Sequence, residues 1–156
     1  MRLALFQPDI PQNLGSAIRL SACLGVFLDI IEPCGFPLDD KSIKRAAMDY
    51  TTCAKVSRHD SFDAFCAFRR TLNDDGRLIL FTTKAAQPYT DFTFRASDIL
   101  LMGRESAGVP DTVHAGADAR LYVPMQAGAR SINVINTAAM ALGEALRQTG
   151  GFAPQP

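Results

Sequence analysis

The residues that could hold a ligand gather late in the chain, in two segments. Gly103–Pro110 follows an apolar run, and Pro124–Asn133 precedes a long helical pattern. Glycine permits close approach of a ligand or a positive φ. Ser131 and Asn133 stand at the expected start of the last helix, where free backbone amides and the positive end of the helix dipole favour an anionic group. The two segments predict a ligand site in the C-terminal part of the chain.

The first expected strand-to-helix turn lacks the motifs that usually bind phosphate. The segment Gln7–Gly15 contains neither G-x-G-x-x-G nor G-x-x-x-x-G-K-[ST]. Pro8 and Pro11 also remove backbone N–H groups that a phosphate would need. A flavodoxin-like or other phosphate-cradling module is therefore disfavoured.

Short apolar runs alternate with helical patterns along the whole chain. We expect strands at residues 3–6, 27–31, 55–58, 77–82, 98–102 and 121–124, and helices at 13–24, 41–47, 61–72 and 133–148. Ser61 suits a helix N-cap and Gly25 a helix stop. The pattern predicts the α/β class, with a parallel sheet flanked by helices on both faces. Ligands bind such sheets at the carboxyl ends of the strands, which both late segments follow.

Composition narrows the class of protein. The 156 residues, 47% hydrophobic, predict one globular domain over 1–156 with a loose tail at 150–156. Lys plus Arg balance Asp plus Glu at 16 each, which disfavours a polycation that coats nucleic acid regardless of sequence. Four cysteines without a C-x-x-C pair predict no metal site. Without an apolar run of about 20 residues or a secretory leader, we expect a cytoplasmic protein outside the membrane. His59 is expected at the surface.

Three segments together resemble one enzyme family. They are residues 8–19, residues 101–110, and Val123–Met125 followed by 130–138. Their order and spacing from Met1 to about Gln148 are similar to the tRNA wobble 2′-O-methyltransferases of the SPOUT superfamily. Residues 31–36 and 49–50 also look like the family's intervening sequence.

This resemblance implies a fold, a cofactor and partners. The C-terminal part would form a trefoil knot that binds S-adenosyl-L-methionine (SAM) in a bent form. Two chains would form a homodimer in which each site uses residues from both. The substrate would be the anticodon stem-loop of tRNA, methylated on the ribose of a wobble cytidine or modified uridine.

The resemblance also assigns roles to residues. Arg19 would be catalytic, Glu105 would orient Arg19 or the ribose, and Asn13 would fix the loop or a phosphate. Arginine stays protonated, so Arg19 must share its proton with a phosphate or stabilise an alkoxide as it forms. The implied SAM-binding positions are Phe81, Gly103, Val123, Ser131 and Asn133.

The sequence departs from the family pattern in places and leaves other functions open. Arg104 stands where these small enzymes often carry proline, and residues 141–143 lack the tyrosine often found in the last helix. A relative acting on ribosomal RNA and a non-catalytic knotted RNA-binding protein are the alternatives. We expect the dimer to pack through small apolar faces of the first and last helices, formed by Ala17, Ala22, Ala138, Ala139 and Ala141.

Overall fold

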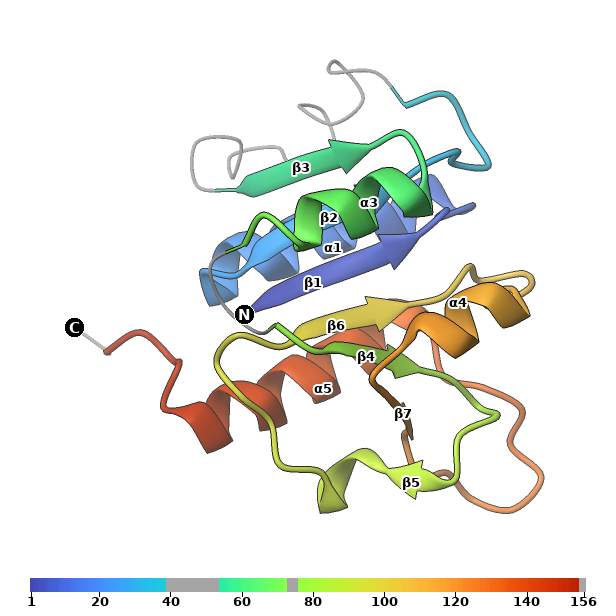
Figure 1. The fold of residues 1–156 in the computed structure, drawn as a ribbon. Helices are drawn as coiled ribbons and strands as arrows, with labels where there is room; N and C mark the ends of the chain where they lie inside the picture. The colour runs from blue at the N-terminus through green and yellow to red at the C-terminus, as the bar shows by residue number, and fades with distance from the viewer. Residues whose placement is uncertain (39–53, 73–75, 155–156) are drawn as a thin grey trace.

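The computed structural model describes residues 1–38, 54–72 and 76–154 (Figure 1). In chain order the elements are β1 (Arg2–Phe6), α1 (Pro11–Leu24), β2 (Phe27–Ile31), β3 (Lys55–His59), α3 (Phe62–Arg69), β4 (Leu78–Phe81), β5 (Gln87–Pro88), the 3-10 helix η2 (Tyr89–Asp91), β6 (Ile99–Met102), α4 (Asp111–Gly116), β7 (Ala119–Tyr122) and α5 (Val134–Thr149). The helix expected at residues 41–47 lies outside the described residues.

The strands form one sheet in the order β3-β2-β1-β6-β4-β7-β5. Every pairing between these strands is parallel. All carboxyl ends therefore meet at one edge, and the loops after β1, β4, β6 and β7 lie next to one another. The predicted α/β class with a parallel sheet between helices is confirmed.

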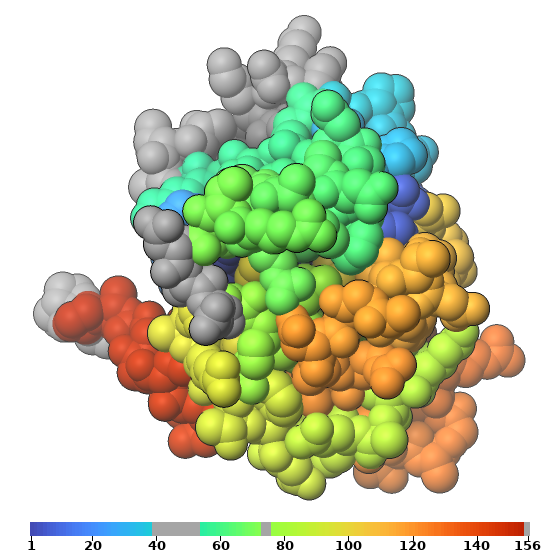
Figure 2. All heavy atoms as spheres, in the orientation of Figure 1, coloured from blue at the N-terminus to red at the C-terminus, as the bar shows by residue number. Residues whose placement is uncertain are grey.

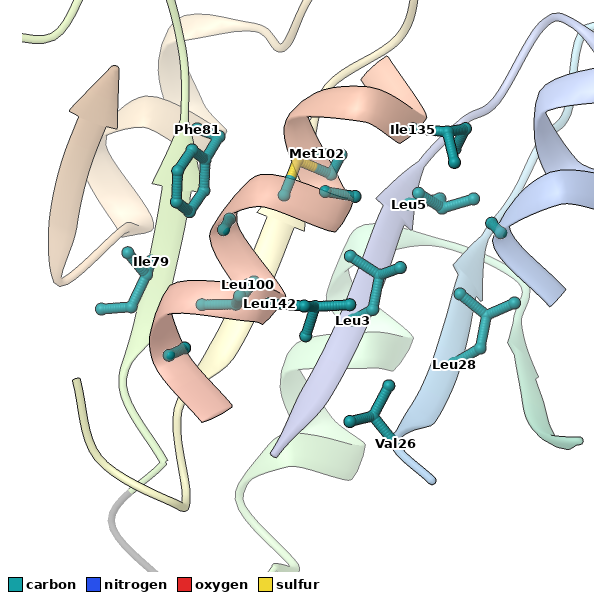
Figure 3. Close-up of a cluster of buried hydrophobic side chains, with 14 of the residues drawn as sticks. Leu3, Leu5, Val26, Leu28, Ile79, Phe81, Leu100, Met102, Ile135 and Leu142 are labelled. Atoms are coloured by element: carbon teal, nitrogen blue, oxygen red, sulfur yellow. The ribbon is translucent and has the colours of Figure 1, made fainter. Parts of the chain in front are cut away.

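Both faces of the sheet are covered, which explains why its strands read as continuous apolar runs. In Figure 1, α1 and α5 lie behind the sheet, and α3 and α4 lie in front. Side chains of alternate residues, such as Leu3 and Leu5 of β1, pack under α1 and α5 (Figure 3). Ala4 and Phe6 point to the other face, beneath Phe65 of α3. The space-filling view shows the side chains of α3 (green) and α4 (orange) over that face (Figure 2).

Local signals place the helix ends close to where the sequence predicts them. Helix α1 begins with Pro11 at its first turn, two residues before the expected start. It ends at Gly25, whose φ of 68° is the left-handed conformation that glycine adopts without strain. Ser61 caps α3 by accepting a hydrogen bond from the Ala64 amide.

Three short elements and the burial of His59 differ from what the sequence predicts. The short β5, η2 and α4 were not predicted, because two to six residues carry too little periodicity. The prediction that His59 lies at the surface is wrong. Its side chain is buried and bonds Asp29 Oδ1 at 2.8 Å. A buried acid on the neighbouring strand provides its partner, which no local pattern reveals.

Candidate active site

A cavity of about 330 Å³ opens at the carboxyl edge of the sheet. Its walls come from the start of α1, the loops after β4, β6 and β7, and the residues before α5. The predicted site residues that line it are Asn13, Phe81, Gly103, Glu105, Val123, Ser131 and Asn133. The structure thus brings together seven of the eight predicted positions, from five separate segments.

A chain of hydrogen bonds joins three of these residues across the mouth of the cavity. Asn133 Nδ2 donates to Asn13 Oδ1 at 3.1 Å, and Asn13 Nδ2 donates to Glu105 Oε1 at 2.8 Å. Asn13 is separated from Glu105 by 92 residues and from Asn133 by 120 residues in sequence. The Asn13 amide accepts through its oxygen and donates through its nitrogen. These bonds fix the orientation of the Asn133, Asn13 and Glu105 side chains.

Asp9 holds the other side of Glu105. The Asp9 amide donates to Glu105 Oε2 at 3.0 Å, so both oxygens of that carboxylate accept a hydrogen bond. The Asp9 carboxylate in turn accepts from the amide and the hydroxyl of Ser106. We call Asp9, Asn13, Glu105 and Asn133 the rim network. It ties the loop after β1 to the loop after β6 and to the start of α5.

The loop that carries Glu105 is tightly closed. Arg104 and Gly108 exchange two backbone hydrogen bonds of 3.0 and 2.8 Å. A Cβ on Gly103 would lie 2.9 Å from the backbone carbon of Gly108, so only glycine allows this approach. Gly108 has a φ of 68°, which also favours glycine. The two glycines noted in the sequence therefore shape the loop that presents Glu105.

The two carboxyl groups of the rim network have pKa values shifted in opposite directions. Burial, and then the neighbouring Asp9 carboxyl, raises the pKa of Glu105. The hydrogen bond with the Glu105 side chain, and then the donors of Ser106, lower the pKa of Asp9. A carboxyl group that lines a cavity, with a pKa shifted away from that of the carboxyl group behind it, is typical of a catalytic site.

The opposite wall of the cavity is apolar. Phe81 at the end of β4 and Val123 after β7 are buried, and Leu80 and Met102 lie beside them. An apolar wall facing a polar rim suits a ligand with a flat hydrophobic ring and a charged end.

Arg19 is the predicted site residue that does not line this cavity. It lies six residues after Asn13 on α1, about 9 Å along the helix and about 120° around its axis. Its side chain is exposed on the outer face of α1, with Ser16 and Cys23. The structure therefore separates Arg19 from the rim network of its own chain.

The start of α5 is capped by Asn133, not by Ser131. The Asn133 side chain accepts hydrogen bonds from the Ile135 and Asn136 amides. Ser131 is exposed, lies before the cap and lines the cavity. Asn133 thus stabilises the helix and orients Asn13 at once.

Sequence reasoning missed Asp9, although it lies within one of the segments that carry the family resemblance. Its signal was weak: an acidic side chain directly after the first strand, at the edge where α/β proteins bind ligands. Within the described residues, no group of three or more His, Cys, Asp or Glu side chains could hold a metal ion. None of the described helices is long and apolar enough to span a membrane.

Known proteins share both the sequence and the fold. The chain is 60% identical over 151 residues to a tRNA (cytidine(34)-2'-O)-methyltransferase of Beijerinckia indica, covering 97% of this chain and 93% of that protein. It is 54% identical to the Ancylobacter novellus protein of the same name, over 98% of this chain and 96% of that one.

Solved structures of other methyltransferases have the same fold as this chain. A structure from work on the 2-OH methylation of C/U34 on tRNA superposes with a TM-score of 0.85 at 38% identity, over 94% of both chains. The SpoU methyltransferase AviRb from Streptomyces viridochromogenes, in complex with AdoMet, superposes with a TM-score of 0.83 at 27% identity. That match covers 95% of this chain and 60% of AviRb.

The sequence also matches the SpoU rRNA Methylase family over residues 1–143, which include every residue of the cavity described above. With the parallel sheet, the glycine-shaped loop and the relatives in agreement, the chain belongs to the SpoU methylase family.

Proposed function

We propose that this protein uses SAM to methylate the 2′-hydroxyl of the ribose at the wobble nucleotide of tRNA, position 34, a cytidine or a modified uridine. The observation that carries the proposal is the rim network facing the apolar wall of the cavity, in a chain 60% identical to a relative named for this reaction. The match extends over 97% of the chain, so the whole site is included.

The cavity fits SAM in size and chemistry. Its apolar wall, with Phe81 and Val123, would hold the adenine ring, and Gly103 would let the backbone approach the ligand closely. Ser131 and Asn133 would contact the polar end. When bound, SAM supplies an activated methyl group on a sulfonium. AdoMet is bound in the structure of AviRb, which has the same fold.

The residues of this chain must position the ribose and accept a poorly acidic proton. Glu105 is held by two donors, which leaves a lone pair on each oxygen for a further contact. Its raised pKa makes it a better proton acceptor than an ordinary carboxylate. Asn13, fixed by Asn133, keeps the Glu105 carboxylate facing the cavity. We assign Glu105 and Asn13 to orienting the acceptor hydroxyl.

We assign the catalytic cation to Arg19 of the second chain of a homodimer. Arg19 lies on the outer face of α1, away from its own cavity, so a partner chain packed on that face would receive it. There its guanidinium would share a proton with a phosphate or stabilise the forming alkoxide. We expect Arg19→Ala to fold and dimerise but to lose methyl transfer.

Mixing two inactive variants tests this assignment. Arg19→Ala and Glu105→Gln are each expected to be inactive as homodimers. If each site combines both chains, random heterodimers carry one intact site and restore about a quarter of the wild-type activity. An arginine acting within its own chain would give no recovery.

The outer faces of α1 and α5 support the dimer with only some of the residues expected. Ala139 is exposed and Ala22 is half-buried, so these two stay accessible to a partner. Ala17, Ala138 and Ala141 are fully buried within the chain, so the prediction that they face a partner is wrong. They allow close packing of α1 and α5 on the sheet instead. The outward stripe of α5 holds Met140, which is 41% exposed, and Gly143, beside which there is open space. We expect Met140→Glu to give a monomer by light scattering, whereas Phe152→Glu on the tail leaves the dimer intact.

We further propose that the loops around the cavity form a trefoil knot and that residues 1–156 act as one domain in the cytoplasm, where tRNA is modified. Support for the knot comes from the shared fold of the SpoU structures. A crystal structure of the SAM complex would trace the chain through these loops. A path that threads no loop would refute the knot.

The decisive experiment is transfer of a labelled methyl group from SAM to tRNA from a strain that lacks this protein, followed by nucleoside mass spectrometry. A 2′-O-methylated pyrimidine at position 34 is expected. Label at another tRNA position would overturn the proposed substrate, and so would label only in ribosomal RNA from the same strain, assayed in parallel. Absence of both methyl transfer and SAM binding would favour a non-catalytic RNA-binding protein.

A further inference from the structure

Arg104 places a positive charge on one particular side of the cavity. The register of the sheet pairs Leu5 with Met102, so Gln7 and Arg104 follow at a similar level, just beyond the ends of the neighbouring strands β1 and β6. Arg104 Nη2 donates a hydrogen bond to Gln7 Oε1 across this gap. The guanidinium therefore points toward β1, on the side of Asn13 and away from Val123 after β7.

Both ends of this contact are rigid. The backbone of Arg104 is locked by its two hydrogen bonds to Gly108, and the Gln7 amide donates to the Ile31 carbonyl at 2.8 Å. Gln7 has a φ of 47°, the left-handed region that non-glycine residues rarely adopt. Such conformations cluster at functional sites, where the surrounding structure enforces them.

None of the acidic side chains that the structure describes pairs with the charge of Arg104. Within the described residues its side chain forms no ion pair, and its hydrogen bond goes to the neutral amide of Gln7. The oxygens of the adjacent Glu105 already accept from Asp9 and Asn13. By contrast, Arg2, Arg69 and Arg77 each pair with an aspartate. Arg104 is half-buried, lines the cavity and retains N–H groups for another acceptor.

We propose that Arg104 binds a phosphodiester of the substrate RNA next to the ribose that is methylated, with Gln7 as its positioning residue. This rests on the proposed function, which puts the adenine ring at Phe81 and Val123 and the ribose at Asn13 and Glu105. A planar guanidinium pairs with two phosphate oxygens at once, which suits fixing the nucleotide in register with the rim network.

The test compares Arg104→Gln with Arg95→Gln. Arg95 is exposed and precedes β6, at the amino end of the sheet, and its replacement removes the same charge far from the cavity. Binding of an anticodon stem-loop RNA is measured by fluorescence anisotropy between about 50 and 200 mM salt, and SAM binding by calorimetry. Arg104→Gln should weaken RNA binding about tenfold and reduce the slope of log Kd against log salt by about 1, with SAM affinity within about twofold of wild type.

Two further variants separate charge from position. Arg104→Lys keeps the charge and should keep the salt slope, while it raises KM because two-oxygen pairing is lost. Gln7→Ala should likewise keep the slope and lower kcat/KM. If Arg104→Gln misfolds, the KM of Arg104→Lys and the kcat/KM of Gln7→Ala still test the proposal, and wild-type values in both would overturn it.

A wild-type salt slope in Arg104→Gln, or a loss that follows SAM affinity instead of RNA affinity, would overturn the proposal. An equal slope change in Arg95→Gln would do the same, because the effect would then be one of net charge. The slopes are measured without turnover. Failure of the wild-type protein to methylate tRNA would therefore count against the proposed function, while the slopes would still decide on Arg104.

Discussion

Two of the polar clusters on this sheet have similar hydrogen bonds but different surroundings. We call Arg2, Asp29 and His59 the sealed cluster. Asp29 accepts from Arg2 at 2.6 and 2.8 Å and bonds His59 at 2.8 Å. The rings of Phe27 and Phe68 lie 4.6 and 5.0 Å from the Arg2 guanidinium. The rim network has comparable hydrogen bonds but opens onto a cavity.

The comparison shows that hydrogen bonding alone does not identify a functional site. In the sealed cluster, the polar groups of three buried side chains satisfy one another beneath α3. In the rim network, Glu105 faces a cavity that an apolar wall completes, and its pKa is shifted in the opposite direction to that of Asp9 behind it. We therefore expect substitutions in the sealed cluster to change stability and those in the rim network to change activity.

The largest expected effect is a loss of stability when a substitution breaks the sealed cluster. Asp29→Ala leaves the Arg2 charge buried without a partner, which should lower the free energy of unfolding by about 3–5 kcal/mol. Urea unfolding followed by circular dichroism measures it, with the exposed Asp60→Ala as control, expected within about 0.5 kcal/mol of wild type. A variant as stable as wild type, or a folded variant with much reduced kcat, would contradict the structural role.

The second-largest expected effect is a loss of activity when a substitution breaks the rim network. Both Glu105 oxygens accept N–H groups, so Glu105→Gln must turn its amide nitrogen toward another donor. Loss of the carboxylate and of its alignment should lower kcat by about 100-fold or more, with a small change in melting temperature. Single-turnover methyl transfer measures the chemical step. An unchanged rate would remove Glu105 from the reaction.

The pH dependence of stability distinguishes the rim network from the sealed cluster through the shifted pKa of Glu105. The raised pKa means that Glu105 binds a proton more readily in the folded chain than in the unfolded one. Its contribution to stability is fully present below its ordinary pKa of 4.5 and is lost as pH rises through the raised pKa. The difference in unfolding free energy between wild type and Glu105→Gln should therefore decrease with pH in that window and then level off.

Asp9 does not obscure that measurement. Its pKa is lowered from 3.8, so its stabilising contribution is lost only as pH falls below that value. A difference between wild type and Glu105→Gln that stays constant with pH above 4.5 would show that the rim network does not perturb Glu105.

The smallest expected effect concerns a thiol beside the rim network. Burial, and then Glu32, raises the pKa of Cys34 to about 11, whereas Cys23 is exposed on α1. At pH 8 the thiolate fraction of Cys34 should be roughly 100-fold below that of an ordinary thiol. Peptide mass spectrometry after iodoacetamide treatment should find Cys23 labelled before Cys34, and Glu32→Gln should speed the labelling of Cys34. Equal rates at both cysteines would argue against the burial.

The sequence by itself determined the elements and the edge of the sheet that carries the site. Apolar runs such as Phe27–Ile31 and stop signals such as Gly25 act locally, so the class and most helix ends could be predicted. The two late segments also identified the loops that line the cavity, because both follow strands at the edge where α/β sheets bind ligands.

Only the tertiary structure decided which of those residues meet. The bond from Asn133 to Asn13 spans 120 residues, and strand order and loop closure, not local pattern, set it. For the same reason Asp9 and Arg104 entered the site unpredicted, His59 was buried against Asp29, and Arg19 was left outside its own cavity. Periodicity reports which face of an element is apolar, whereas contacts between distant loops depend on the register of the whole sheet.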